Sequence, residues 1–70
     1  MTEFNTGLPS VRQIQSLIKG QQTVEIKLTT NDILVGKIRW QDDHCLCLHS
    51  QAEEPTLVWW QAVVYIQPRP

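Results

Sequence analysis

Alternation of apolar and polar residues, which starts at Thr23 and continues almost to the end of the chain, is the feature that most restricts its fold. A period of two places alternate side chains on a buried face and a solvated face, as in a half-buried β-strand. Polar or tight turns interrupt the pattern, which predicts five short strands over residues 23–29, 33–40, 44–49, 56–60 and 63–67. The fold is therefore expected to be mostly β.

The residues before this run have a helical period instead. Four apolar residues fall on one stripe of a helix over residues 11–19: Val11, Ile14, Leu17 and Ile18. Ser10 is placed to cap the first turn while Gln13 reaches back to the backbone, and Gly20 is placed to end the helix. Residues 1–7 are polar and aperiodic, which predicts a disordered tail before one domain over residues 8–70.

A glycine interrupts the apolar face of the second predicted strand. Leu34, Gly36, Ile38 and Trp40 have the same parity and are expected to share one face. A glycine in the middle of a strand marks a sharp bend or a close approach of backbones. The pattern predicts a strongly bent antiparallel sheet, closed into a small barrel.

Such a short chain needs a further source of stability. A domain of this length buries only about 60% of the surface that its unfolded form exposes. Cys45 and Cys47 lie two apart in an alternating run, where a mutual disulfide does not fit. Oligomerisation is the remaining route, and we expect it here.

The polar residues around the third strand do not form a recognisable metal or catalytic site. Alternation places Cys45, Cys47 and His49 on one face and His44 on the other, and the spacing is not that of a zinc site. Neighbouring aspartates at 42 and 43 read as a solvated turn. We expect buried or half-buried cysteines, no metal, no cofactor and no enzymatic activity.

The charge balance limits the kind of nucleic-acid binding that is possible. Six Lys and Arg against seven Asp and Glu give a net charge of −1, so any contact with nucleic acid must be local. The longest apolar run, residues 62–66, is far shorter than a membrane span. The sequence predicts a soluble cytoplasmic protein without membrane insertion.

Three tryptophans are a large aromatic content for this length. Trp59 and Trp60 are adjacent, so in a strand they point to opposite faces and one is expected to be exposed. Two interpretations stay open. Both rings pack, one in the core and one across a subunit boundary, or the outward ring stacks on a base or anchors a protein partner.

A helix followed by five bent strands with a glycine in mid-strand resembles the Sm fold, and its details resemble the Hfq family of bacterial Sm-like proteins over about residues 8–68. The matching positions are Val24, Ile26, Leu28, Asn31, Leu34, Gly36, Ile38, Asp42, Leu46, Leu48, residues 62–66 and Pro68. The resemblance implies a homohexameric ring in which the fourth strand of one subunit pairs with the fifth strand of its neighbour. Such closure also removes exposed sheet edges.

The resemblance also implies where single-stranded RNA binds. On the pore face, the family's tyrosine-lysine-histidine triplet is replaced here by Trp59, Trp60 and Gln61. The candidate residues of that face are Ser10, His44, Trp60 and Gln61; those of the opposite face are Lys27, Asn31 and Tyr65; and those of the rim are Lys19 and Arg39. The missing lysine and histidine predict weakened RNA sites.

Two functions follow from this comparison. The first is an Hfq-like ring that presents single-stranded RNA, of the RNA-chaperone and post-transcriptional regulation type. The second is a hexameric docking module whose main partner is another protein, which an exposed tryptophan on a nearly neutral surface favours.

Overall fold

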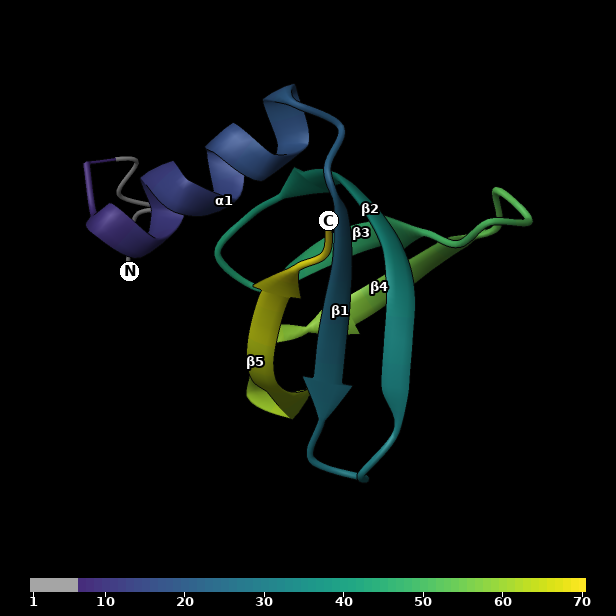
Figure 1. The fold of residues 1–70 in the computed structure, drawn as a ribbon. Helices are drawn as coiled ribbons and strands as arrows, with labels where there is room; N and C mark the ends of the chain where they lie inside the picture. The colour runs from purple at the N-terminus through teal and green to yellow at the C-terminus, as the bar shows by residue number, and fades with distance from the viewer. Residues whose placement is uncertain (1–6) are drawn as a thin grey trace.

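A computed structural model describes residues 7–70 and contains one helix and one five-stranded antiparallel sheet (Figure 1). The elements are α1 (Pro9–Lys19), β1 (Thr23–Leu28), β2 (Ile33–Gln41), β3 (Cys45–His49), β4 (Pro55–Trp59), a 3-10 turn (Trp60–Ala62) and β5 (Val63–Pro68). The strand order is β4-β3-β2-β1-β5. The predicted Sm-like arrangement is confirmed. The predicted disordered tail lies outside the described residues except for Gly7, which belongs to a turn.

The helix begins earlier than expected, and the prediction that Ser10 caps it is wrong. Pro9 occupies the first turn and Leu8 is the N-cap, with no side-chain cap hydrogen bond. The proline ring fixes a helical φ and its missing N–H needs no partner there, so the helix starts before Ser10. At the other end the helix stops at Lys19 as predicted, with Gly20 as the C-cap. Gly20 itself has a right-handed φ of −81°, and the residue with a left-handed backbone conformation after the helix is Gln21, with φ of 53°.

One face of the bent sheet forms the core. Its largest fully buried side chains are Val24, Ile26, Ile38 and Leu46. The predicted stripe of α1 packs against this cluster through Ile14, Leu17 and Ile18. Figure 1 shows the helix lying across one end of the sheet, above the strands. The helix thereby covers apolar side chains of the core that the strands do not cover.

A bulge in β2 overturns the prediction that Trp40 shares the buried face. Ile38 pairs with Leu48, but the next paired residue on β2 is Trp40, opposite Cys47, so Arg39 is the extra residue. The insertion reverses the alternation after Ile38. Trp40 is 45% exposed on the outer face of the sheet, whereas Gln41 pairs with the buried Leu46.

Gly36 marks a close approach of two backbones, as the sequence predicts. It is buried in β2, opposite Val24 of β1. A Cβ at this position would lie 2.9 Å from the carbonyl carbon of His49, still closer to its oxygen, and 3.2 Å from Leu48 Cγ. Only glycine leaves room for β3 at this point of the bend.

The described residues leave one side of β4 and one side of β5 unpaired within the chain. β5 pairs with β1 along its other side, with an irregularity between Lys27 and Leu28. A short 3-10 turn joins β4 to β5, so Trp60 lies in this turn and not at the end of a strand as predicted. The chain thus places its two sheet edges in consecutive elements.

Candidate functional site

The turn between β2 and β3 is fixed by one carboxylate. Asp42 Oδ1 accepts hydrogen bonds from the backbone N–H of His44 at 2.8 Å and of Cys45 at 2.9 Å. These two hydrogen bonds hold the pKa of the Asp42 carboxyl below its usual value, and the bond from Cys45 has the larger effect. His44 consequently lies in the turn rather than in the strand, and its side chain is 75% exposed with Nε2 3.3 Å from Asp43 Oδ1.

Trp60 joins this turn to the β4–β5 connection. Its indole Nε1 donates to the carbonyl oxygen of Asp42 at 2.7 Å, and its backbone N–H donates to the carbonyl oxygen of His44 at 3.1 Å. The ring is half-buried against the core. Two of the predicted pore-face residues are therefore held together, and the exposed Gln61 follows directly in the 3-10 turn.

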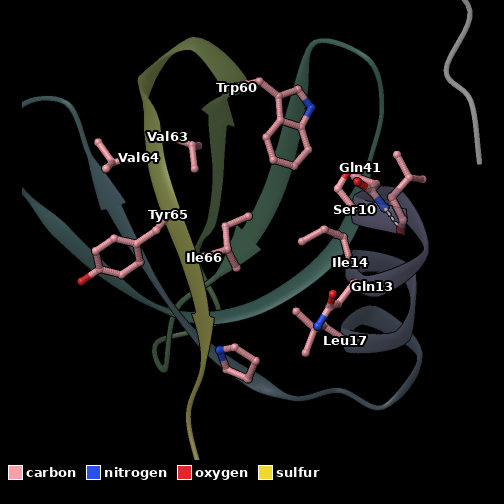
Figure 2. A pocket seen from close by; sticks show the side chains of 12 residues that line it. Ser10, Gln13, Ile14, Leu17, Gln41, Trp60, Val63, Val64, Tyr65 and Ile66 are labelled. Atoms are coloured by element: carbon pink, nitrogen blue, oxygen red, sulfur yellow. Dashed lines mark hydrogen bonds between the residues drawn. The ribbon is translucent and has the colours of Figure 1, made fainter. Parts of the chain in front are cut away.

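Ser10 meets the same region from the helix side. It lies exposed in the first turn of α1 and lines a groove of about 510 Å³ between α1 and β5, with Trp60 at one end (Figure 2). Gln41 also lines the groove, and its Nε2 donates to the carbonyl oxygen of Val11 at 3.4 Å. The remaining lining is largely apolar. From α1, Ser10 and Gln13 are the residues with polar side chains in the lining.

The residues predicted for the opposite face lie on β1, β5 and the turn after β1. Lys27 and Tyr65 are direct cross-strand partners. The Tyr65 hydroxyl donates to Glu25 Oε2 at 2.6 Å, and Arg69 Nη1 lies 3.9 Å from Glu25 Oε1. The hydrogen bond to Glu25, with smaller contributions from burial and charge, raises the pKa of Tyr65. A carboxylate thus lies within this face.

Asn31 lies at the tip of the β1–β2 hairpin. It adopts φ of 77°, a left-handed conformation that asparagine tolerates better than most residues. Its N–H donates to the carbonyl oxygen of Leu28 at 2.9 Å, and Thr30 Oγ1 donates to Asp32 Oδ2 at 2.6 Å. The backbone conformation gives Asn31 a role in the turn whatever else its side chain contacts.

The two predicted rim residues occupy separate elements. Lys19 ends α1, whereas Arg39 is the bulged residue of β2. Arg39 lines a hollow of about 330 Å³ together with Lys37 and His49, and Lys19 is not part of its lining. Sequence reasoning missed Lys37 and His49 because their proximity depends on the β2–β3 register.

The cysteines of β3 are free and buried, as expected. Their environment is apolar on the outer face, where Trp59 pairs with Cys45 and Leu57 pairs with Cys47. Burial is the main cause that raises the pKa of the Cys45 thiol. Within residues 7–70, no group of three or more His, Cys, Asp or Glu is arranged to hold a metal ion. None of the described helices has the length and apolar character needed to cross a membrane.

Both sheet edges expose apolar side chains. On β4, Leu57 is 50% and Trp59 51% exposed; on β5, Val64 is 58% exposed. The prediction that one of the adjacent tryptophans is exposed is confirmed, and the exposed ring is Trp59. These side chains flank strands whose outer backbone groups have no partner strand within the described chain.

Comparison with known proteins gives a consistent result. The family model described as "Hfq related" matches residues 8–68. The crystal structure of an Hfq protein from Anabaena sp. is 46% identical, with a TM-score of 0.81, and the match covers 90% of this chain and all of that one. A structure described as the pleiotropic translational regulator Hfq shares the fold at 17% identity, with a TM-score of 0.78 over 83% of this chain and 95% of that one. No curated protein matches the chain in sequence.

Proposed function

The chain belongs to the Hfq-related family, and from this premise we propose that it forms a cytoplasmic homohexameric ring that presents single-stranded RNA for post-transcriptional regulation. The observation that carries the proposal is that Trp60 bonds to the turn that carries His44 and precedes Gln61 directly, while Ser10 and Trp60 line one groove. Such a function requires neither catalysis nor a cofactor.

The two unpaired strands support ring assembly. β4 of one subunit pairs with β5 of the next, which satisfies the outer backbone groups of both strands. The exposed apolar side chains Leu57, Trp59 and Val64 lie on these strands and lose contact with water on assembly. A strand-edge charge tests this step. Val64→Glu is expected to give smaller species in light scattering. Thr56→Glu is the control, because it adds the same charge on β4 without replacing an apolar side chain, and it should reduce the size of the assembly less.

The pore face offers hydrogen-bonding groups rather than charge. Ser10, His44 and Gln61 are exposed and can contact base edges or stack. Trp60 donates its N–H to Asp42, and its ring is half-buried against the core, so only part of the ring surface is available. Without the lysine and histidine expected from the family resemblance, we expect RNA affinity on this face to be weak.

The opposite face combines Lys27 and the ring of Tyr65 with the carboxylate of Glu25, beside which Arg69 lies. Lys27 supplies charge for a phosphate and Tyr65 supplies a ring. Glu25 accepts the Tyr65 hydroxyl and opposes phosphate on the same face. Removal of this charge by Glu25→Gln is therefore expected to strengthen RNA binding if this face is used.

RNA binding at two salt concentrations tests the proposal. Binding of a short uridine-rich or adenine-rich strand is expected at about 50 mM salt and should weaken towards 200 mM, because phosphate contacts release counterions. Gln61→Ala should weaken binding if the pore face is used, and Lys27→Gln if the opposite face is used. A ring that binds neither RNA at low salt would contradict the proposal.

A second candidate function is a docking ring for another protein. The observation that favours it is the exposure of Trp40, which lies on β2 away from the two assembling strands, on a chain of net charge −1. A ring without RNA affinity, whose protein partner is lost on Trp40→Ala, would support this alternative in place of RNA presentation.

A further inference from the structure

The outer face of β3 carries two cysteines that are buried although they do not point into the core. β3 sends its leucines into the core, so Cys45 and Cys47, which alternate with them, lie on its other face. Both are nonetheless at most 5% exposed. Cys47 pairs with Trp40 on one side and Leu57 on the other, and Cys45 pairs with Trp59. The large side chains of the neighbouring strands thus shield the thiols and present an apolar surface to solvent.

This outer face is organised in three rows that cross the strands. The middle row contains Trp40, which pairs with Cys47. Lys37 pairs with β3 two residues after Cys47, so its row lies about 7 Å from the middle row. In the other direction, the next row lies about 7 Å away again and reaches the β2–β3 turn, where the N–H of Asp42 donates to the carbonyl oxygen of Cys45 at 2.9 Å. The indole is therefore equally far from the two flanking rows.

One flanking row is cationic. Lys37 and the bulged Arg39 are exposed and line the same hollow of about 330 Å³. No salt bridge joins either cation to a carboxylate within residues 7–70. Glu53 and His49 also line this hollow, so its fixed charges sum to +1 with His49 neutral. This row attracts a negatively charged group.

The row on the other side of Trp40 is acidic. Asp42 and Asp43 follow in the turn and give it a charge of −2 with His44 neutral. The Asp42 carboxylate holds the turn through two backbone hydrogen bonds. Asp43 is exposed, and its contact is with the His44 ring at 3.3 Å. Asp43 is thus the acid that can be replaced without loss of the turn.

The three rows are self-complementary under a two-fold rotation. A two-fold axis that lies in the plane of contact along the middle row brings the Trp40 indole of one copy onto that of a second copy. Because the flanking rows are equally far from this axis, the rotation places the cationic row of each copy opposite the acidic row of the other. A partner of a single charge sign, such as a nucleic acid or an acidic peptide, would be attracted by one row and repelled by the other.

We call this surface the Trp40 patch; its members are Lys37, Arg39, Trp40, Asp42 and Asp43. We propose that the Trp40 patch binds the Trp40 patch of a second copy of the chain that belongs to another ring. Indole packs on indole at the centre of the contact, and opposite charges meet on both sides of it. The inference takes the ring from the proposed function, goes beyond RNA presentation and needs no RNA.

The Trp40 patch stays accessible when a ring closes. β2 is the central strand of the sheet, whereas ring closure uses the unpaired sides of β4 and β5. The patch is also small, because a stable protein interface uses about 20–30 residues a side. We therefore expect a weak and reversible association of rings, which increases with protein concentration by mass action.

Sedimentation velocity of the full chain tests the contact, with the protein freed of RNA and kept under reducing conditions. Over a range from about 1 µM to about 1 mM of chain, species of about 97 kDa, twelve times 8.1 kDa, should grow at the expense of rings of about 49 kDa. Trp40→Ala should shift this association to concentrations at least about ten-fold higher, because it removes the centre of the contact.

A charge swap tests the orientation of the two copies. Arg39→Glu faces the acidic row of its partner and Asp43→Lys faces the cationic row, so each variant alone should associate at least about ten-fold more weakly than the wild type. A mixture of the two variants should regain association, because the new glutamate of one copy meets the new lysine of the other while the remaining native pair is kept. A loss of folding would not be rescued by mixing.

The control for charge reversal is Arg12→Glu. Arg12 is an exposed cation on α1, outside the Trp40 patch, and its replacement should leave the association of rings unchanged. Light scattering of each variant in dilute solution checks that the ring itself is retained. Val64→Glu, by contrast, should reduce the ring mass, so that failure of the ring and failure of the patch give different results.

Three outcomes would overturn the proposal. A wild type that stays at about 49 kDa over the whole concentration range refutes the contact and leaves the ring intact. Larger species that persist unchanged in Trp40→Ala, Arg39→Glu and Asp43→Lys form through another surface, which refutes the patch. Rings that do not associate but bind labelled polyglutamate, with loss of this binding in Arg39→Glu, would assign the patch to an acidic partner in place of a second copy.

Discussion

Replacement of Gly36 by alanine should destabilise the protein although alanine is intrinsically better in a strand. Glycine in mid-strand costs about 0.5–1 kcal/mol relative to alanine, so a site with free space would gain stability. Here the new Cβ would lie 2.9 Å from the carbonyl carbon of His49 and closer still to its oxygen. The contact is with backbone, which cannot turn aside as a flexible side chain can.

The size of the effect follows from these opposing contributions. Overpacking of a well-filled site typically costs about 1–3 kcal/mol. We take the upper end of this range, about 3 kcal/mol, because the clash is with backbone. Subtracting the conformational gain leaves a loss of about 2 kcal/mol. For a domain of this size, such a loss lowers the melting temperature by roughly 8–16 °C.

Thermal and urea unfolding of Gly36→Ala at matched protein concentration measure this loss, because assembly makes stability depend on concentration. Gly20→Ala is the control. Gly20 has φ of −81°, and a Cβ there would meet the Ser16 carbonyl oxygen at 3.3 Å, so its stability should stay within about 0.5 kcal/mol of wild type. Equal stability of the Gly36→Ala variant and the wild type would refute the close-approach argument.

Three further predictions follow from individual hydrogen bonds. Trp60→Phe removes the donor to the Asp42 carbonyl and should lower the free energy of unfolding by about 1 kcal/mol in addition to the loss from packing. Urea unfolding measures this loss, and Trp59→Phe, which removes no such donor, is the comparison. Because the pKa of Asp42 is lowered in the folded protein, its carboxylate stabilises the fold at pH values above the usual pKa of 3.8, and this contribution is lost as the pH falls through the lower folded pKa. The melting temperature of Asp42→Asn should therefore fall less than that of the wild type as the pH is lowered. Because the pKa of Tyr65 is raised in the folded protein, its protonated hydroxyl stabilises the fold at pH values below the usual pKa of 10.0, and this contribution is lost as the pH rises through the higher folded pKa. The melting temperature of Tyr65→Phe should therefore depend less on pH above 10 than that of the wild type.

The periodicity of the sequence was sufficient to predict the elements and their order. Val24 and Ile26 are fully buried as the alternation of β1 requires, and the stripe on α1 packs on the core. The start of the helix was misplaced because Pro9 competes with Ser10 for the first turn. The face of Trp40 was mispredicted because alternation assumes an uninterrupted strand, and no local signal in residues 38–41 announces the bulge.

The candidate sites were predictable only as far as a family resemblance carries them. The resemblance named Lys27 and Tyr65 for one face, but the hydrogen bond from Tyr65 to Glu25 depends on the pairing of β1 with β5. The hollow that contains Lys37 and His49 likewise depends on register. Long-range strand pairing joins residues that are distant in sequence, and residue spacing alone does not determine it.

The mass of the protein in the presence of a short single-stranded RNA tests the central claim most directly. At low salt, light scattering should give about 49 kDa, six times the 8.1 kDa of one chain, plus the mass of the RNA. Raising the salt should release the RNA while the ring mass remains. A particle of about 8 kDa at every concentration, or a ring that carries no RNA at low salt, would contradict the account.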